Sequence, residues 1–215
     1  MKKFLSMSLI ALVALSLAAC GGGGGGGDTR TIFVAQILSD QRADGDIAFD
    51  PVLRTFTVTS GPQTLFFGID DHAPNLPEYR AFLDFPLDGS TGEDVVPADA
   101  VIVSARLELF ITEVSFATAV PALIDLVPYP VSGLMPQDFD SSPLLFREFD
   151  FFRSDQGNFV TIDVTVFMRE AQRLGLSDFQ VRFLLDLAVS DIGFVGIEDL
   201  PRITITTPRL TVEFE

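Results

Sequence analysis

The stretch from Val101 to Thr112 reads Val-Ile-Val-Ser-Ala-Arg-Leu-Glu-Leu-Phe-Ile-Thr. Every second side chain along it, Val101 and Val103 included, is apolar, and the side chains between them include Arg106 and Glu108. Alternation with a period of two is typical of a β-strand that buries one face and exposes the other. The stretch therefore predicts a long, half-buried strand.

The same alternation, or a short apolar run, recurs along most of the chain. It predicts further strands at residues 31–37, 53–59, 64–69, 79–85, 122–129, 160–164, 179–187, 202–206 and 210–214. Clusters of Pro and Gly separate these segments, as turns require. Many short strands with such turns indicate an all-β fold, here a jelly-roll-like antiparallel β-sandwich formed as a single domain by residues 31–215.

One segment departs from the two-residue period. Within residues 165–174 apolar side chains recur at helical spacing, with polar side chains between them. Gly175 stands where such a helix would end, because glycine readily adopts the left-handed conformation that closes a helix. We expect one short helix, with Asp163 or Thr165 as its cap.

The amino terminus resembles a bacterial lipoprotein signal. Two lysines precede an apolar run at residues 4–17, whose 14 residues are fewer than the roughly 20 that span a bilayer. The run ends in Leu17-Ala18-Ala19-Cys20, small residues before a cysteine, as a lipoprotein signal peptidase requires. Residues 1–19 are therefore predicted to be a cleaved signal peptide, and Cys20 the site of lipidation.

A flexible tether is predicted to follow the lipid. Residues 20–30 hold the cysteine and the glycines from Gly21 to Gly27. Two or three acyl chains, which the resemblance implies, give stable anchoring, whereas one chain holds only marginally. The expected location is the cell envelope. The outer membrane is favoured, because Gly21 occupies the position where some inner-membrane lipoproteins carry Asp.

The net charge of the mature chain limits the classes of molecule that it can bind. Both lysines leave with the signal peptide, so twelve arginines remain against 30 acidic residues, a net charge of −18. Nucleic-acid affinity depends on cationic contacts to phosphate, so nucleic acid is excluded as a partner. Anionic surfaces are disfavoured for the same reason, whereas divalent cations are permitted.

No catalytic constellation is evident. Cys20 is committed to the lipid, His72 is the single histidine, and no Gly-x-Ser-x-Gly motif occurs. Nucleophilic catalysis needs an activated nucleophile beside a base. Asp70, Asp71 and His72 suit either a solvated loop or, less readily, a transition-metal site. We expect a protein that is not an enzyme.

The candidate metal site is an acidic loop. Asp40, Asp44, Asp46 and Asp50 lie within eleven residues, and calcium takes six to eight oxygen ligands from such flexible segments. The spacing does not match an EF-hand. Structural calcium is thus the one cofactor considered, and solvated turn carboxylates are the alternative.

The candidate ligand patch combines two predicted strands. Arg80 and Asp84 share one face of their strand, and Arg106 with Glu108 are placed to neighbour them across a sheet. The four residues suit a polar ligand. The alternative is a ladder of exposed ion pairs across neighbouring strands.

Four segments carry a family resemblance. They are Tyr-Arg-Ala-Phe-Leu-Asp-Phe at 79–85, Val-Pro-Ala-Asp-Ala-Val-Ile-Val-Ser-Ala-Arg-Leu-Glu-Leu-Phe at 96–110, Val-Thr-Ile-Asp-Val-Thr at 160–165 and Pro-Arg-Leu-Thr-Val-Glu-Phe at 208–214. Together they resemble the DNRLRE-type domain of secreted bacterial proteins. The resemblance implies a jelly-roll-like sandwich, and some of its relatives are carbohydrate-binding modules, alginate binders among them.

The functional prediction follows from location and from the lack of a catalytic pattern. We expect a lipid-anchored, non-catalytic interaction module of the cell envelope, whose partners are the membrane and either a glycan or an envelope protein. One alternative is a module that binds a neutral polysaccharide. The chain has no Trp and only Tyr79 and Tyr129, so Phe would have to supply further stacking rings. A glycan-active envelope enzyme is the second alternative.

Overall fold

Strand β6 (Ile102–Ser115) organises the fold of this computed structural model, which describes residues 30–90, 93–200 and 206–215. Its first part pairs with β12 and β9, and its last part pairs with β11. One strand thus belongs to both halves of a curled antiparallel sheet. The predicted signal peptide, Cys20, the glycine tether and most of the expected strand at 202–206 lie outside the described residues.

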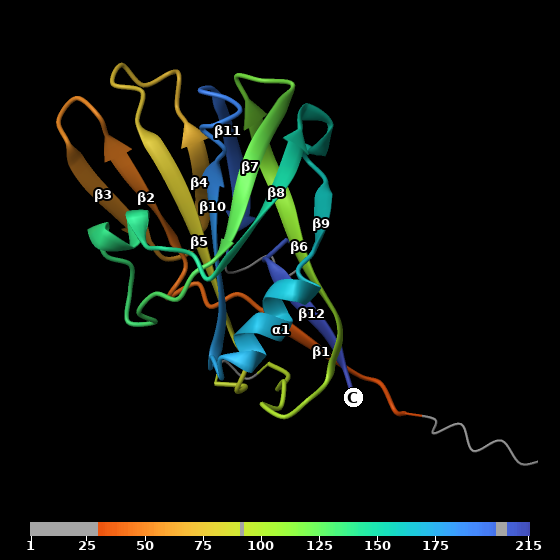
Figure 1. Ribbon diagram of the computed structural model, residues 1–215. Helices are drawn as coiled ribbons and strands as arrows, with labels where there is room; N and C mark the ends of the chain where they lie inside the picture. The colour runs from red at the N-terminus through yellow and green to blue at the C-terminus, as the bar shows by residue number, and fades with distance from the viewer. Residues whose placement is uncertain (1–29, 91–92, 201–205) are drawn as a thin grey trace, which may run out of the picture. The chain divides into compact units, whose positions relative to one another are not determined.

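The described residues of the domain form twelve strands, one α-helix and two short 3-10 helices (Figure 1). The remaining strands are β1 (Phe33–Leu38), β2 (Gly45–Asp50), β3 (Thr55–Ser60), β4 (Gln63–Ile69), β5 (Glu78–Pro86), β7 (Ala119–Leu126), β8 (Leu145–Phe152), β9 (Phe159–Asp163), β10 (Asp178–Leu185), β11 (Gly193–Asp199) and β12 (Arg209–Phe214). The helices are α1 (Thr165–Arg173), η1 (Pro136–Asp140) and η2 (Arg153–Asp155). The all-β, sandwich-like fold with one short α-helix is confirmed.

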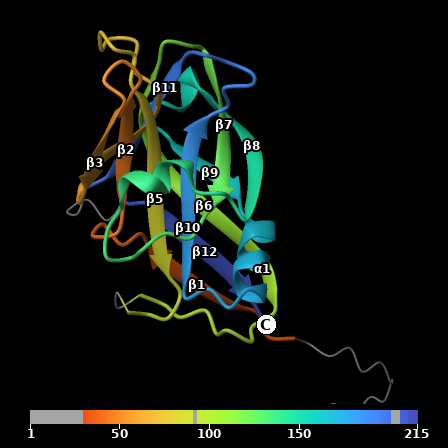
Figure 2. The same cartoon turned by 60° about the vertical axis from the view of Figure 1, so that its left-hand side comes forward.

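The strand order is β1-β12-β6-β11-β4-β5-β10-β7-β8, with β2 beside β5, β3 beside β2, and β9 beside β6. Figures 1 and 2 show β5, β10, β7 and β8 in one layer and β6 with β12 in another. Helix α1 lies against β6 and β10, one strand from each layer. The two layers therefore enclose the core, and α1 covers one end of it.

The core is filled by phenylalanine and branched aliphatic side chains. Its largest members without exposed surface are Phe67, Phe85, Phe151, Phe179, Phe183, Ile37, Leu65, Leu83, Leu107 and Leu109. Burying one such side chain contributes about 1.5–3 kcal/mol to stability. A second, smaller cluster lies on the outer side of β5 and β2, where the segment 127–144 covers Ile47 and Phe82. Most of the phenylalanines are thus structural.

The alternation that predicted β6 is interrupted twice. The pairing with β12 skips Val103, so Ile102 and Ala105 are buried while Val101 is 59% exposed. The pairing with β11 skips Thr112, so Ile111 and Val114 both enter the core. Each skipped residue is a β-bulge, which reverses the phase of the pattern. The expectation that Val101 and Val103 point inward is therefore wrong at the start of the strand.

Helix α1 ends as predicted and begins slightly differently. Gly175 has a φ of 67°, and the Leu176 N–H donates to the Ala171 carbonyl oxygen at 3.0 Å, which is a Schellman-type closure. Val164 is the N-cap residue, while the Asp163 carboxylate accepts the Thr165 N–H at 2.9 Å. Within the described residues no helix is long and apolar enough to cross a membrane.

Candidate functional site

An aromatic cluster lies on three neighbouring strands of the sheet. It consists of Phe66 on β4, Tyr79 on β5, Phe194 on β11, Phe116 in the β6–β7 turn and His72 in the β4–β5 loop. The strand order β11-β4-β5 brings the first three together. The side chains of Phe66, Tyr79 and Phe116 are partly exposed, and His72 is exposed. The cluster thus presents the rings of Phe66, Tyr79 and Phe116 to solvent, while Phe194 is 8% exposed.

The register of β4 and β11 sets the position of the central ring. Phe66 lies opposite Gly196, and Phe194 is its diagonal neighbour. A Cβ on Gly196 would come within 3.1 Å of the Phe66 ring and 2.5 Å of the Thr112 hydroxyl oxygen, so only glycine leaves this space free. The rings of Phe66 and Phe194 then stack at 5.0 Å with an interplanar angle of 8°.

Tyr79 and Phe116 extend the cluster at its two ends. The Tyr79 ring meets Phe66 at 6.4 Å and Phe194 at 5.4 Å, both edge to face. Phe116 has a φ of 67°, a conformation that costs roughly 1–3 kcal/mol for a residue other than glycine. Its ring contacts Phe194 at 6.2 Å and His72 at 4.8 Å. The surrounding structure therefore holds Phe116 in place against its own backbone preference.

Carboxylates lie beside the rings. The Asp46 carboxylate accepts the Phe66 N–H at 3.1 Å, and burial raises the pKa of Asp46 to about 6. Burial, followed by the negative charges of Asp70 and Asp46, raises the pKa of Tyr79. The cluster therefore combines ring faces, which pack against apolar C–H groups, with the partly exposed Asp70 carboxylate, which can accept hydrogen bonds from hydroxyl groups.

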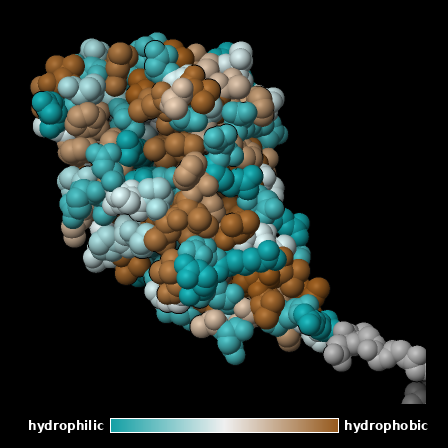
Figure 3. Space-filling model, in the orientation of Figure 1, coloured by the Kyte–Doolittle hydropathy of each residue, from teal (hydrophilic) through white to brown (hydrophobic). Residues whose placement is uncertain are grey.

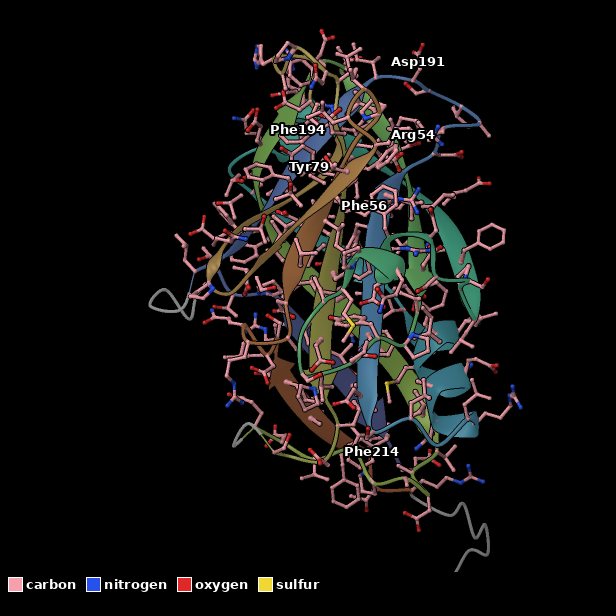
Figure 4. All side chains as sticks on the ribbon, turned by 90° about the vertical axis from the view of Figure 1, so that its left-hand side faces the viewer. Arg54, Phe56, Tyr79, Asp191, Phe194 and Phe214 are labelled. Carbon is pink, nitrogen blue, oxygen red and sulfur yellow. The ribbon has the colours of Figure 1, made fainter. Side chains whose placement is uncertain are left out.

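A second aromatic group occupies another part of the same side of the molecule. It consists of Phe49, Phe56 and Phe139, with ring centroids between 4.9 and 5.9 Å apart. Figure 4 shows Tyr79 and Phe194 close to each other and Phe56 displaced from them. Phe139 belongs to η1 and is 3% exposed. Phe139 is therefore buried within this group, whereas Phe56 is 38% exposed.

Arg80, predicted as a ligand-binding residue, instead holds that segment in place. Its guanidinium lies 3.8 Å from the centre of the Phe139 ring, donates to the Phe139 carbonyl oxygen and pairs with Glu78 at 2.8 Å and Asp140 at 3.0 Å. The neighbouring Arg182 donates to the same carbonyl at 2.8 Å and pairs with buried Asp125. Both arginines are engaged within the fold.

The other three members of the predicted ligand patch do not join Arg80. Asp84 is 1% exposed and lies in the interior. Arg106 and Glu108 are on β6, which pairs with β9, β11 and β12 and not with β5. There Arg106 pairs with Glu213 at 2.9 Å and Arg209 with Glu108 at 2.7 Å. The four-residue patch is therefore not formed, and β6 carries the ladder of ion pairs given above as the alternative.

The four aspartates of the predicted calcium loop have different surroundings in the fold. Asp44 and Asp46 are buried, Asp40 pairs with Arg42 at 3.1 Å, and Asp50 accepts the N–H groups of the turn after β2 at 2.8 Å. In the part of the chain that the structure describes, no three His, Cys, Asp or Glu side chains are placed to share a metal ion. Asp46 and Asp50 belong to the strand at residues 45–50, and Asp40 and Asp44 precede it.

Sequence reasoning missed Phe66, Phe194 and Phe116 as members of a site. Phe66 stands between two core residues, Leu65 and Phe67, and nothing in this run separates the outward ring from its buried neighbours. The one available signal was Gly196, a glycine inside a strand, which often marks close approach of another group.

None of the protein-family models matches the chain, and no curated protein matches it.

Proposed function

We propose that this protein is a lipid-anchored, non-catalytic binding module of the cell envelope and that its aromatic cluster contacts a neutral glycan. The partly exposed rings of Phe66 and Tyr79 carry the proposal. They come from adjacent strands, so backbone hydrogen bonds fix their relative positions before any ligand arrives. Preorganised rings reduce the ordering cost of binding.

The charges around the cluster favour an uncharged ligand. Asp46 and Asp70 act on Tyr79, and the mature chain has twelve arginines against 30 acidic residues. A uronic acid polymer would be repelled by these carboxylates. Hydroxyl groups of a neutral sugar would instead donate hydrogen bonds to the partly exposed Asp70, while the apolar faces of the sugar pack on the rings.

Glycan binding is tested by titrating neutral and anionic polysaccharides into the wild-type domain and into Tyr79→Ala and Phe66→Ala variants. A stacked ring contributes about 0.5–1.5 kcal/mol beyond its buried area, which corresponds to a weakening of up to about tenfold in Kd for each variant. Phe146→Ala is the matched control, because Phe146 is 63% exposed and lies on β8, away from the cluster. Equal binding by all variants would contradict the proposal.

Anchoring is tested separately. With Cys20 intact, the chain is expected in the membrane fraction and to incorporate labelled palmitate. Cys20→Ser should abolish both properties and leave the folded domain unchanged. A wild-type chain recovered without lipid would contradict the anchoring half of the proposal.

An envelope protein is the second candidate partner, favoured by the edge of the sheet. Within the described residues β8 pairs only with β7, so its other edge is open to an added strand. Phe146 is 63% exposed, Phe152 48% and Val166 67%. Figure 3 shows hydrophobic side chains over the central and lower parts of the face that carries β7, β8 and α1. Cross-linking in cells that Phe146→Glu abolishes would support this partner.

A further inference from the structure

Three carboxyl groups are buried near one another in the interior, where five segments of the chain come together. Asp44 precedes β2, Asp84 is on β5 and Asp199 is the last residue of β11, and their exposed fractions are 0%, 1% and 0%. Gln180 of β10 and Tyr129, which follows β7, lie beside them. This acid cluster belongs neither to the aromatic cluster nor to the contacts of Arg80.

Each carboxyl group is hydrogen-bonded through one oxygen only. The Asp84 N–H donates to Asp44 Oδ1 at 2.6 Å, Gln180 Nε2 to Asp84 Oδ1 at 2.7 Å, and the Ser39 hydroxyl to Asp199 Oδ1 at 3.2 Å. The Oδ2 atom of all three carboxyl groups is buried without a hydrogen-bond partner. A buried polar atom left without a partner costs about 1–3 kcal/mol.

The Tyr129 hydroxyl is a second sign that the acid cluster lacks hydrogen-bond partners when all three carboxyl groups are ionised. Tyr129 is 7% exposed, and its hydroxyl oxygen also has no partner. Burial first, and then the negative charges of Asp44 and Asp84, raise the pKa of Tyr129. The hydroxyl therefore lies within the electrostatic reach of the carboxyl groups.

Every charge found to act on these carboxyl groups is negative. Asp199 and Asp84 act on Asp44, while Asp178 and Asp40 act on Asp84, and Asp40 also acts on Asp199. The negative charge of Asp138 in η1 acts on Tyr129. Arg42 is exposed and forms an ion pair with Asp40. Within the described residues no arginine forms an ion pair with the three buried carboxyl groups.

Three ionised carboxylates cannot share an apolar interior without compensation. Burial raises the pKa of Asp84 to about 7 and that of Asp199 to about 7. Burial, followed by the charge of Asp199, raises the pKa of Asp44 well above its ordinary value. Protons are thus retained in the cluster at a pH where exposed aspartates are ionised.

We propose that Asp44 and Asp199 hold one proton between them as a hydrogen-bonded acid pair that fastens the segment from Ser39 to Asp44 to the sheet. Asp44 Oδ1 already accepts the Asp84 N–H, so Asp44 Oδ2 carries the proton and donates it to Asp199 Oδ2. The Ser39 hydroxyl, at 3.2 Å from Asp199 Oδ1, holds Asp199 against the segment that carries Asp44, and a hydrogen bond from the Asp44 side chain lowers the pKa of Asp199. One proton then satisfies two of the four unpartnered oxygens.

The pair has a definite pH dependence. A carboxyl group whose pKa is raised by folding binds more protons in the folded than in the unfolded state. Its stabilising contribution is complete below the unfolded pKa and is lost as the pH rises through the folded pKa. The loss should loosen the segment that bears the Ser39 and Asp40 N–H groups, which donate to the Pro208 and Asp84 carbonyl oxygens at 3.0 and 2.8 Å.

Thermal unfolding of the mature domain at about pH 6 and at about pH 8.5 tests the pair. The wild type should have a lower Tm at the higher pH. Asp44→Asn should show a smaller drop, because asparagine accepts the Asp84 N–H and donates to Asp199 without losing a proton. Asp191→Asn, which removes an equal charge from an exposed position, should behave as the wild type does.

Hydrogen exchange of the wild type gives a second measurement that needs no variant to fold. After correction for intrinsic rates, the Ser39, Asp40 and Asp84 amides should open more readily at the higher pH, and amides of the β6–β12 pairing should not. A Tm drop in Asp44→Asn equal to that of the wild type would overturn the proposal. So would millimolar calcium that raises the Tm at the higher pH and EDTA that reverses the rise, since the cluster would then hold a metal ion.

Discussion

The aromatic cluster and the second aromatic group differ in what covers them. Phe139 packs on Phe49 and Phe56, and the Arg80 guanidinium stacks on its ring. Phe66 and Tyr79 have no such cover within the described residues and remain partly exposed. The Phe139 ring thus serves stability, whereas the rings of Phe66 and Tyr79 keep surface that is free for contact. The difference lies in the segment 127–144, which the two arginines hold in place.

The largest effect is expected at Arg182. Arg182→Ala leaves Asp125 buried without its cation, and both side chains are 4% exposed. Removing one member of a buried ion pair costs about 3–5 kcal/mol. Chemical denaturation should show this loss, and Arg182→Met with Asp125→Leu should recover most of it. A single variant as stable as the wild type would mean that the arginine does not hold the cover.

Asp46 tests the aromatic cluster through pH. Burial raises its pKa to about 6, so the folded state binds its proton more tightly than the unfolded state does. Stability should fall from about pH 4 to about pH 6, by up to about 3 kcal/mol at about 1.4 kcal/mol per pKa unit. In Asp46→Asn this part of the pH dependence should vanish, while the Phe66 N–H keeps an acceptor. Denaturation midpoints of the wild type and of Asp46→Asn, measured across this range, test the prediction. The same pH dependence of stability in both proteins would contradict the assignment of this pH dependence to Asp46.

Arg80 sharpens the comparison. Arg80→Met keeps an unbranched side chain near Phe139 but removes the cation–π contact and the hydrogen bond to the segment. A loss of about 1–2 kcal/mol is expected, since a desolvated cation–π contact contributes up to about 2 kcal/mol. Glycan binding should not change, because Arg80 faces the second group. If Arg80→Met lost glycan binding and kept its stability, Arg80 would belong to the ligand site.

The smallest effect is expected on β6. Arg106 and Glu213 are 54% and 30% exposed in their side chains, and such surface pairs contribute about 0–1 kcal/mol. Arg106→Ala should therefore lower stability by less than about 0.5 kcal/mol and leave binding unchanged. A larger loss of stability, or loss of binding, would show that β6 carries part of the site.

Much of the fold could be predicted from local pattern. The alternation along β5, β9, β10 and β12 placed these strands correctly, and the helical spacing with Gly175 located α1. Three strands were not predicted. β2 was interpreted as part of a calcium loop because Asp40, Asp44, Asp46 and Asp50 lie close together in the sequence, although Asp46 is buried. β8 alternates exposed with half-buried side chains, and β11 is interrupted by Gly196.

The site was less accessible to sequence reasoning, because it depends on pairings between distant segments. Phe66, Tyr79 and Phe194 meet only through the order β11-β4-β5, and Arg80 and Arg106 are separated by the same pairings. The buried carboxyl groups were hidden for another reason. Asp44 and Asp84 have the sequence surroundings of surface residues, and only the packed structure shows their exposed fractions of 0% and 1%.

Glycan binding by the open and the covered rings tests the central claim most directly. Neutral polysaccharides should be titrated calorimetrically into Tyr79→Ala, which loses a partly exposed ring, and into Phe139→Leu, which loses a ring that is 3% exposed. The account predicts that Tyr79→Ala weakens binding by up to about tenfold and that Phe139→Leu binds as the wild type does. Wild-type binding by Tyr79→Ala, or an equal loss in both variants, would contradict it.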